Sequence, residues 1–205
     1  MIEYPKINSI YKRDGRGKFL IGEYSQPEFE YLSLNQWEGT EKVDGTNIRV
    51  IWDKEKVTFN GKTDNAQTPS FLLKKLQELF PVEEFKSFYP DLALTLYGEG
   101  YGSGIQKGGG NYINDRCGFI LFDVLVDNWW LKKDDIQDVA NKLQIDTVPF
   151  AGYFTLYSAV ELTQQGFKSV FGDFQAEGLV LKPSTELKDR KGHRIITKIK
   201  CKDWK

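Results

Sequence analysis

Cysteine and histidine are scarce in this chain of 205 residues, which has two cysteines and one histidine. Cys117 and Cys201 lie far apart in the sequence and have no metal-type spacing, so neither a zinc site nor a disulfide framework is expected. His193 stands among basic residues, and no Ser-His or Cys-His catalytic pair can be built on it. The scarcity of both residue types favours a reduced, intracellular protein, and we expect it in the cytoplasm.

Several segment types that mark other protein classes are also missing. No apolar run approaches the roughly 20 residues that a membrane-spanning helix needs. The opening residues from Met1 to Lys6 have no signal-peptide layout. Internal repeats, low-complexity tracts and Pro/Ser-rich linkers are absent. We therefore expect a monomer without a membrane partner, folded as a single domain over residues 1–205.

Two common nucleotide-binding loops are lacking as well. The sequence has no G-K-[ST], so a Walker phosphate loop is excluded. Gly98, Gly100, Gly102 and Gly104 imitate a dinucleotide-binding loop, but no strand-loop-helix unit with the required acidic residue follows them. Any nucleotide site in this chain must therefore be of another kind.

The charge of the chain is close to balanced but unevenly distributed. The formal net charge is -1, yet the stretch from Lys182 to Lys205 holds nine Lys/Arg against three Asp/Glu, a local net of +6. A basic stretch on an otherwise acidic chain favours an anionic partner held at one face. A solvated tail is the alternative that charge alone leaves open.

Strand-like runs dominate the secondary structure expected from the sequence. Strands are predicted at Asn47–Trp52, Lys56–Phe59, Leu92–Tyr97, Gly118–Val126, Gly178–Lys182 and Arg194–Lys202. Helices are predicted after Ser70, over Lys133–Leu143 and over Ser158–Phe167. Because strands and helices do not alternate regularly, we expect an α+β fold of mainly antiparallel sheets with flanking helices.

The strongest chemical signal is a lysine followed by a short turn, just before a predicted strand. The residues are Glu41-Lys42-Val43-Asp44-Gly45-Thr46-Asn47. A lysine attacks phosphorus only when its amine is neutral, so nearby positive charge or desolvation must lower its reference pKa of about 10.4. Gly45 suits a tight turn that lets the backbone approach a ligand. Alone, this pattern also describes a solvated hairpin lysine.

An ordered set of further motifs separates these two interpretations. After the lysine motif come Leu96–Gly102, Ile105–Lys107, Phe122-Asp123, Ala176–Pro183 and Ile199–Lys202. In order and spacing they resemble the nucleotide-site motifs of the covalent nucleotidyltransferase superfamily of polynucleotide ligases and mRNA capping enzymes. More narrowly, the chain is similar to the nick-sealing RNA ligase 2 family, from about Trp37 to the end. The resemblance implies the nucleotidyltransferase, ATP-grasp-like fold, with the nucleotide in a cleft between its sheets.

The resemblance also implies a role for each motif residue. Lys42 would attack the α-phosphate of ATP and form a lysyl-AMP adduct. Glu41 would help to read the adenine edge, Phe122 would stack on the adenine, and Glu99 would contact the ribose. Glu177 would place a divalent metal, Mg²⁺ or Mn²⁺, near the phosphates.

The basic motif residues would act on the phosphates. Lys182, Lys200 and Lys202 would neutralise the triphosphate and the transition state, and would depress the pKa of Lys42. Lys198, Lys200 and Lys202 have the period of one strand face. Of the three, we interpret Lys198 as a charge that protects an edge strand.

Four remaining residues complete the predicted site. Asn47 offers a polar contact to ATP, while Gln106 and Lys107 are candidate nucleic-acid contacts. Related RNA ligases carry a phosphate-binding arginine 20 residues beyond the nucleophile, where this chain has Lys62. Lysine keeps the charge but loses the two-pronged geometry, which puts handling of the 5′-phosphate in doubt.

The predicted function is ATP-dependent joining of RNA 3′-hydroxyl and 5′-phosphate ends. Asn47 and the Lys200-Cys201-Lys202 ending favour RNA over DNA. The chain ends directly after the last motif, so we expect no C-terminal nucleic-acid-binding domain. Three alternatives stay open: a DNA ligase, a GTP-using guanylyltransferase, or a nucleotide- or nucleic-acid-binding module whose catalysis has lapsed.

Overall fold

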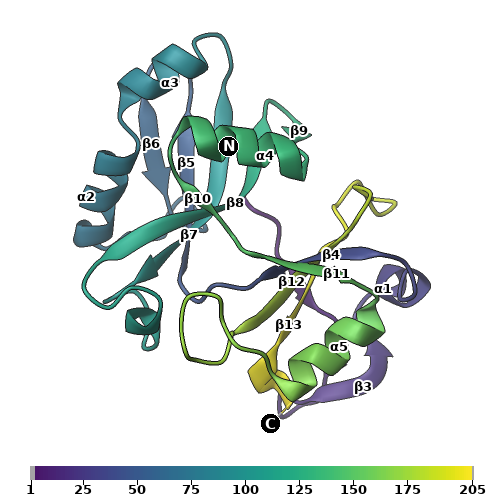
Figure 1. Cartoon of the computed structure of the whole chain (residues 1–205). Coiled ribbons are helices and arrows are strands. Elements are labelled where there is room, and N and C mark those ends of the chain that lie inside the picture. Colours follow the sequence, from purple (N-terminus) through teal and green to yellow (C-terminus); the bar gives the residue numbers. More distant parts are fainter. Residues whose placement is uncertain (1–2, 205) are drawn as a thin grey trace. The chain divides into compact units, whose positions relative to one another are not determined.

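A computed structural model describes residues 3–204 of the chain (Figure 1). The chain divides into two compact units, each assembled from segments that are distant in sequence. Unit 1 comprises the segment ending at Tyr4 together with Asp44–Val148, and unit 2 comprises Pro5–Val43 and the segment that starts at Pro149. The division falls between Val43 and Asp44, inside the lysine motif. Lys42 therefore belongs to unit 2, and Asn47 to unit 1.

Unit 1 is built on a six-stranded sheet with helices against one face. Its elements are β5 (Thr46–Trp52), β6 (Val57–Asn60), α2 (Ser70–Leu79), α3 (Val82–Phe88), β7 (Leu94–Gly102), the 3₁₀ helix η1 (Gly109–Asn111), β8 (Cys117–Val126), β9 (Trp129–Trp130), α4 (Lys133–Lys142) and β10 (Asp146–Thr147). The strand order is β10-β8-β7-β5-β6, with β9 paired to β8. All pairs are antiparallel except β10 with β8.

The core of unit 1 follows from strand alternation. On β5, Ile48, Val50 and Trp52 point to the face that α2, α3 and α4 cover, and each is at most 1% exposed. Asn47 and Arg49 alternate with them and therefore lie on the opposite face. This opposite face carries Asn47 of the lysine motif and Glu99 of β7, which are paired in the strand register.

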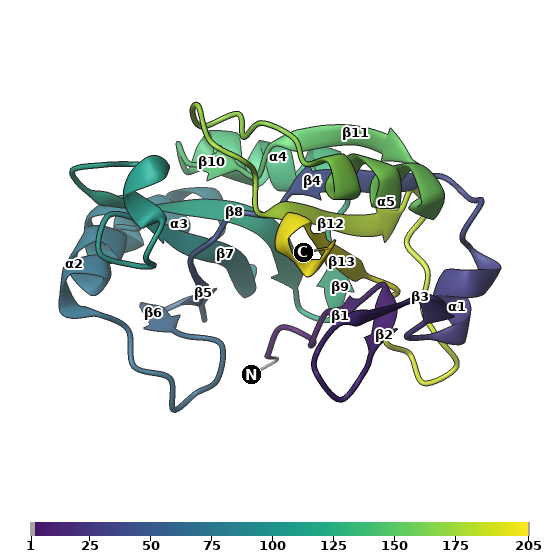
Figure 2. The ribbon, with the colours of Figure 1, turned by 90° about the horizontal axis from the view of Figure 1, so that it is seen from below.

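Unit 2 has a five-stranded sheet and a small two-stranded one. Its elements are β1 (Asn8–Ser9), β2 (Tyr11–Arg13), β3 (Phe19–Tyr24), α1 (Pro27–Tyr31), β4 (Trp37–Glu41), β11 (Phe150–Phe154), α5 (Leu156–Gln165), β12 (Gly178–Pro183), β13 (Thr197–Lys200) and the 3₁₀ helix η2 (Cys201–Trp204). The larger sheet has the order β1-β13-β12-β4-β11, and β2 pairs with β3. Within unit 2, α5 runs along one face of the larger sheet (Figure 2).

The core of unit 2 leaves the other sheet face to polar residues. Trp37, Leu179, Leu181 and Ile199 are fully buried together with apolar residues of α5. Their neighbours in the strands point the opposite way. This second face carries Lys42 and its partners.

The predicted fold class is confirmed, because both larger sheets are mainly antiparallel and helices flank them. The strands predicted at Asn47–Trp52 and Lys56–Phe59 also form, as β5 and β6, and they pair as an antiparallel hairpin. The strand expected over Arg194–Lys202 is shorter, since β13 ends at Lys200. Beyond it the chain turns into η2, where Trp204 donates from Nε1 to Thr163 Oγ1 at 3.2 Å.

No helix within residues 3–204 is long and apolar enough to cross a membrane. The longest helices have 10 residues.

Candidate active site

Lys42 lies directly after β4 and continues the path of that strand. Its backbone N–H donates to Gly178 O at 2.9 Å, so the chain still runs beside β12 at this point. Strand alternation puts Lys42 on the face of Thr40, away from the apolar core of unit 2. The lysine side chain is 20% exposed, within reach of solvent but largely shielded.

Glu177 joins Lys42 to a second lysine. Lys42 Nζ lies 2.8 Å from Glu177 Oε2, and Lys200 Nζ lies 2.6 Å from Glu177 Oε1. The carboxylate is 11% exposed, and the lysines are 20% and 24% exposed. We call these three residues the Lys42–Glu177–Lys200 cluster. It brings together three of the four residues that the sequence predicts as catalytic.

A glycine makes this arrangement possible. Gly178 pairs with Lys200 in the β12–β13 register and has φ 152, a conformation that favours glycine. A Cβ atom at Gly178 would lie 2.0 Å from Ile199 O. Only glycine therefore lets β12 come close enough to β13 to set Glu177 beside Lys200.

Gly45 is required for a comparable reason within unit 1. A Cβ atom there would lie 2.2 Å from Gly100 O and 2.7 Å from the side chain of Glu99. In the structure this glycine lets the chain pass close to β7, and the approach of a ligand to the same turn stays a prediction. The close approach holds Gly45 against the strand that carries Glu99.

Glu41 is buried, and both of its carboxylate oxygens accept hydrogen bonds. Its side chain accepts hydrogen bonds from Ser169 Oγ at 2.6 Å and from the Val170 backbone N–H at 3.1 Å. The residue is 2% exposed. Both carboxylate oxygens thus fasten the loop between α5 and β12 to the end of β4. A direct contact of Glu41 with adenine stays a prediction.

The other predicted phosphate-binding lysines of unit 2 lie outside the cluster. Lys182 is on the same sheet face, but it lies four residues further along β12 than Gly178. In the strand register it is opposite Glu38 of β4. Lys202 is exposed and lies in η2, so it does not continue the face of Lys198 and Lys200 as its spacing suggests.

In unit 1, Asn47 and Glu99 face each other across β5 and β7. Asn47 Oδ1 is buried and has no hydrogen-bond partner among the described residues. A buried acceptor without a partner is costly, so a ligand or water that donates a hydrogen bond would stabilise it. This feature fits the predicted polar contact of Asn47 with ATP.

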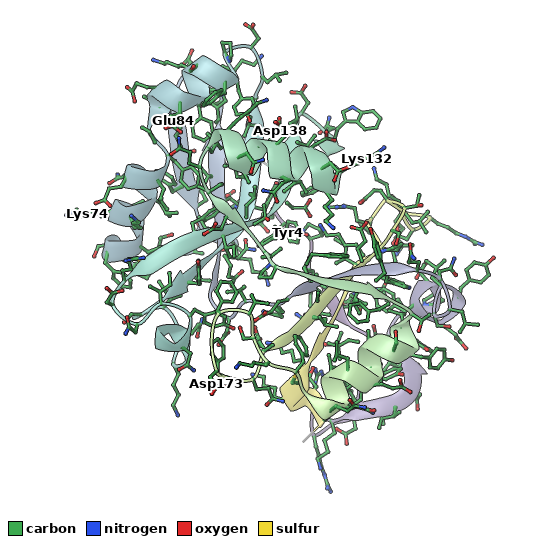
Figure 3. All side chains as sticks on the ribbon, in the orientation of Figure 1. Tyr4, Lys74, Glu84, Lys132, Asp138 and Asp173 are labelled. Carbon is green, nitrogen blue, oxygen red and sulfur yellow. The ribbon has the colours of Figure 1, made fainter. Side chains whose placement is uncertain are left out.

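Phe122 is half-buried in β8 and packs on Tyr4, a residue that the sequence did not single out. The rings of Tyr4 and Phe122 lie edge to face at 5.0 Å, and Tyr4 OH donates to Asp123 Oδ2 at 2.8 Å. Tyr4, labelled in Figure 3, also contacts Tyr97 and Trp130 at centroid distances of 5.2 and 5.6 Å. Tyr4 therefore fixes the orientation of Phe122, and the rings of Tyr97 and Trp130 hold Tyr4 in place. Tyr4 belongs to none of the sequence motifs, and it is 119 positions from Asp123 along the chain. Sequence patterns therefore did not reveal this role.

Burial raises the pKa of several tyrosines in unit 1. Burial raises the pKa of Tyr97 to about 12, an effect that Arg49 reduces and Asp123 reinforces. Tyr97 is therefore a neutral phenol at any physiological pH.

Lys62 is exposed on the loop after β6, and a buried arginine fixes this loop. Arg49 donates from Nε to Gly61 O at 2.9 Å and pairs with Asp64 Oδ1 at 2.7 Å. Gln106 donates from Nε2 to Gly45 O at 3.0 Å, while Lys107 is exposed. Gln106 thus supports the lysine motif, and its contact with nucleic acid, like that of Lys107, stays a prediction.

Side chains that could bind a metal are dispersed in the described residues. Within the part of the chain that the structure describes, no three His, Cys, Asp or Glu side chains gather as a metal site. Mg²⁺ needs only one or two protein carboxylates when phosphates and waters supply its remaining oxygens. Glu177 alone therefore fits a metal that arrives with a nucleotide.

Comparison with known proteins supports these observations. The sequence model of the RNA ligase family matches residues 35–200. The comparison with curated proteins found no match.

Solved structures of mutant RNA ligase from Naegleria gruberi have a similar fold. An apo form has a TM-score of 0.68 and 19% identity, covering 97% of this chain and 57% of that one. A form with ATP and Mn has a TM-score of 0.67 and 18% identity, covering 96% and 61%. A form with AMP and Mn gives 0.68 and 19%, covering 97% and 57%. The chain thus spans 57% to 61% of the ligases it matches. Since the family match covers most of the chain, this protein belongs to the RNA ligase family.

Proposed function

We propose that this chain is an ATP-dependent RNA ligase that works through lysyl-AMP. The observation that carries the proposal is the Lys42–Glu177–Lys200 cluster, in which a carboxylate lies between a shielded lysine amine and a second cation. Membership of the RNA ligase family and the likeness to a ligase solved with ATP and Mn support the same activity.

The reaction has three steps in which bonds and leaving groups balance. Lys42 Nζ forms a bond to the α-phosphorus of ATP as the bond to pyrophosphate breaks. An oxygen of an RNA 5′-phosphate then attacks the same phosphorus, which frees the lysine and leaves a 5′–5′ pyrophosphate link. A 3′-hydroxyl oxygen finally attacks the 5′-phosphate, and AMP departs.

The residues of unit 2 serve the first step directly. Lys42 must lose a proton before it attacks, and Glu177 Oε2 is hydrogen bonded to its Nζ. Lys200 places a positive charge beside the Glu177 carboxylate. This charge would stabilise the negative charge that develops on the phosphates during transfer. A divalent metal held by Glu177 would supply further positive charge to the phosphates.

The residues of unit 1 serve nucleotide recognition. Phe122 offers an aromatic face to adenine, held by the ring of Tyr4. Asn47 and Glu99 offer polar contacts. The buried Asn47 Oδ1 would accept a hydrogen bond from the nucleotide. Lys62 of unit 1, together with Lys182 and Lys202 of unit 2, would complete the proposed phosphate contacts.

Mass spectrometry after incubation with ATP and Mg²⁺ tests this function. The protein should gain the mass of one AMP, and Lys42→Ala should not, while Lys12→Ala, which removes an exposed lysine of unit 2, should gain it as the wild type does. A gain that persists in Lys42→Ala would place the nucleophile elsewhere. Labelling from GTP alone would indicate a guanylyltransferase, and no adduct with any nucleotide or metal would indicate a binding module. Sealing of nicked RNA against nicked DNA separates the two ligase types.

A further inference from the structure

The loop between β12 and β13 carries a group of exposed cations in unit 2. It projects beyond the ends of these strands, as the yellow loop in Figure 1 shows. Its tip, residues 188–193, contains Lys188, Arg190 and Lys191 against a single carboxylate, Asp189. All three cations are exposed, and none is in an ion pair within residues 3–204. We call residues 188–193 the basic tip.

The basic tip is an ordered turn and not a loose run of charge. Asp189 Oδ1 accepts hydrogen bonds from the backbone N–H groups of Lys191 and His193, both at 2.8 Å, and Oδ2 lies 3.0 Å from His193 Nδ1. Burial raises the pKa of Asp189, but the bonds from His193 and Lys191 outweigh it and leave that pKa below its ordinary value. The only carboxylate of the tip is thus occupied in shaping the backbone. The three cations are left pointing into solvent.

A second hairpin of this protein shows that such a turn does not require excess charge. In the β5–β6 turn of unit 1, Asp53 Oδ1 accepts in the same way from the N–H groups of Glu55 and Lys56. That turn carries Lys54 and Lys56 against Asp53 and Glu55, so its net charge is zero. The basic tip carries +2 with its histidine neutral. A turn of this kind therefore forms without a net positive charge, and the excess charge of the basic tip is not needed to build it.

The basic tip lies on the same hairpin as the Lys42–Glu177–Lys200 cluster, at its other end. Glu177 and Lys200 meet at the Gly178 end, and the chain then advances through Pro183 before the loop begins. Five residue steps at about 3.3 Å each separate the two ends by about 17 Å. Successive nucleotides of one strand advance about 3.4 Å along the axis of a duplex. The tip lies beyond the Pro183 end of β12, so it is at least about five nucleotides from the cluster along a duplex axis, which is beyond the reach of a single ATP.

We infer that the basic tip binds the phosphate backbone of the polynucleotide substrate, several nucleotides from the end that is joined. This inference rests on the proposed ligase function for its substrate, but it concerns binding and not adenylylation. Lys188, Arg190 and Lys191 contact phosphates without reading bases, so they add affinity that salt weakens.

Paired charge removals on the two hairpins test the inference. Arg190→Gln/Lys191→Gln removes two cations from the basic tip, and Lys54→Gln/Lys56→Gln removes two from the matched β5–β6 turn. Binding of a nicked RNA duplex of about 24 base pairs is measured by fluorescence anisotropy between about 50 and 200 mM salt. The tip variant should lose affinity at low salt, and its salt dependence over this range should shrink by about tenfold, the contribution of two phosphate contacts. The β5–β6 variant should bind as the wild type does.

Two additional measurements separate this inference from the proposed function. Formation of lysyl-AMP should be unchanged in both variants, since neither pair belongs to the ATP machinery. Arg190→Lys/Lys191→Arg keeps both charges and should bind RNA normally. Equal affinity and equal salt dependence of the tip variant and the β5–β6 variant would overturn the inference, even where lysyl-AMP forms. Absence of lysyl-AMP in the wild type would overturn the proposed function, while the difference in salt dependence would still establish the phosphate-binding surface.

Discussion

Lys42 Nζ is hydrogen bonded to Glu177 Oε2 at 2.8 Å, across 135 positions of the chain. The other oxygen of the same carboxylate holds Lys200. Glu177 therefore holds the proposed nucleophile and Lys200 on either side of one carboxylate. The bridge between the two lysines depends on the charge of Glu177 and on the length of its side chain.

The first prediction concerns this bridge. Glu177→Gln removes the charge, and Glu177→Asp shortens the side chain by one methylene so that it no longer spans both lysines. Both variants should form lysyl-AMP at least about 100-fold more slowly, a typical cost for removing a group that stabilises a transition state. The rate is measured by mass spectrometry under single-turnover conditions.

A control for this prediction comes from an exposed glutamate of the same unit. Glu161→Gln, on α5, should leave the rate of adduct formation unchanged. If Glu177→Asp were as fast as the wild type, charge alone would suffice and the bridge would have no role in catalysis.

The second prediction concerns the loop that Glu41 fastens. Ser169→Ala deletes the 2.6 Å hydrogen bond to Glu41 Oε1 and leaves a buried carboxylate oxygen without that donor. Hydrogen bonds to charged groups contribute about 1.5–3 kcal/mol, so the free energy of unfolding should fall by about that amount. Urea unfolding followed by tryptophan fluorescence measures the change.

Ser184→Ala is the matched control, because Ser184 makes its hydrogen bonds to Gln36 at the surface. Its unfolding free energy should change by less than about 0.5 kcal/mol. Equal losses in both serine variants would show that Glu41 does not stabilise the loop through Ser169.

Much of this fold is readable from local sequence patterns. The β5–β6 hairpin forms where alternating residues flank Asp53 to Lys56, and α4 covers Lys133–Lys142 as its apolar spacing predicts. The strand β8 also matches its apolar run, within one residue at its start. These elements are determined by residues close in sequence, and for that reason pattern and structure agree.

Elements that depend on distant partners were not predicted. β11 has few buried side chains and exists because it pairs with β4, more than 100 positions earlier. The expected strand over Arg194–Lys202 ends early because Trp204 packs on Tyr11 and Phe19, which no local pattern reveals. The division of the lysine motif between two units is likewise a property of long-range contacts.

The candidate site shows the same limit. Motif order singled out Lys42, Glu177 and Lys200, and the structure brings these three together. It did not identify Ser169 or Tyr4, whose contacts reach 128 and 119 positions along the chain. Residues that support a site are chosen by geometry and not by spacing in the sequence.

The third prediction concerns one such supporting residue. Tyr4→Phe keeps the ring against Phe122 but removes the hydrogen bond to Asp123 Oδ2. The unfolding free energy should fall by about 1.5–3 kcal/mol, as for other bonds to a carboxylate. Tyr4→Ala should cost more, since it also removes ring contacts with Phe122, Tyr97 and Trp130.

Activity distinguishes two consequences of these Tyr4 variants. If Phe122 stacks on adenine, loss of the ring in Tyr4→Ala should raise the KM for ATP more than it lowers kcat for adduct formation. Tyr4→Phe should leave this KM near that of the wild type. An unchanged KM in Tyr4→Ala would mean that Phe122 keeps its orientation without Tyr4 or does not contact the nucleotide.

The fourth prediction follows from the raised pKa of Tyr97, about 12 in the folded protein. An unfolded tyrosine titrates near 10, so above that pH the unfolded state loses a proton that the folded state keeps. The stabilisation is complete below about pH 10 and is lost progressively as the pH rises toward 12. Tyr97→Phe has no proton to lose, and its unfolding free energy should fall less steeply between pH 10 and 12 than that of the wild type. Tyr31→Phe, at a site 87% exposed, should keep the steep fall because its phenol is in water in both states. Equal slopes for the wild type and Tyr97→Phe in urea unfolding across this range would mean that Tyr97 ionises as readily in the folded protein as in water.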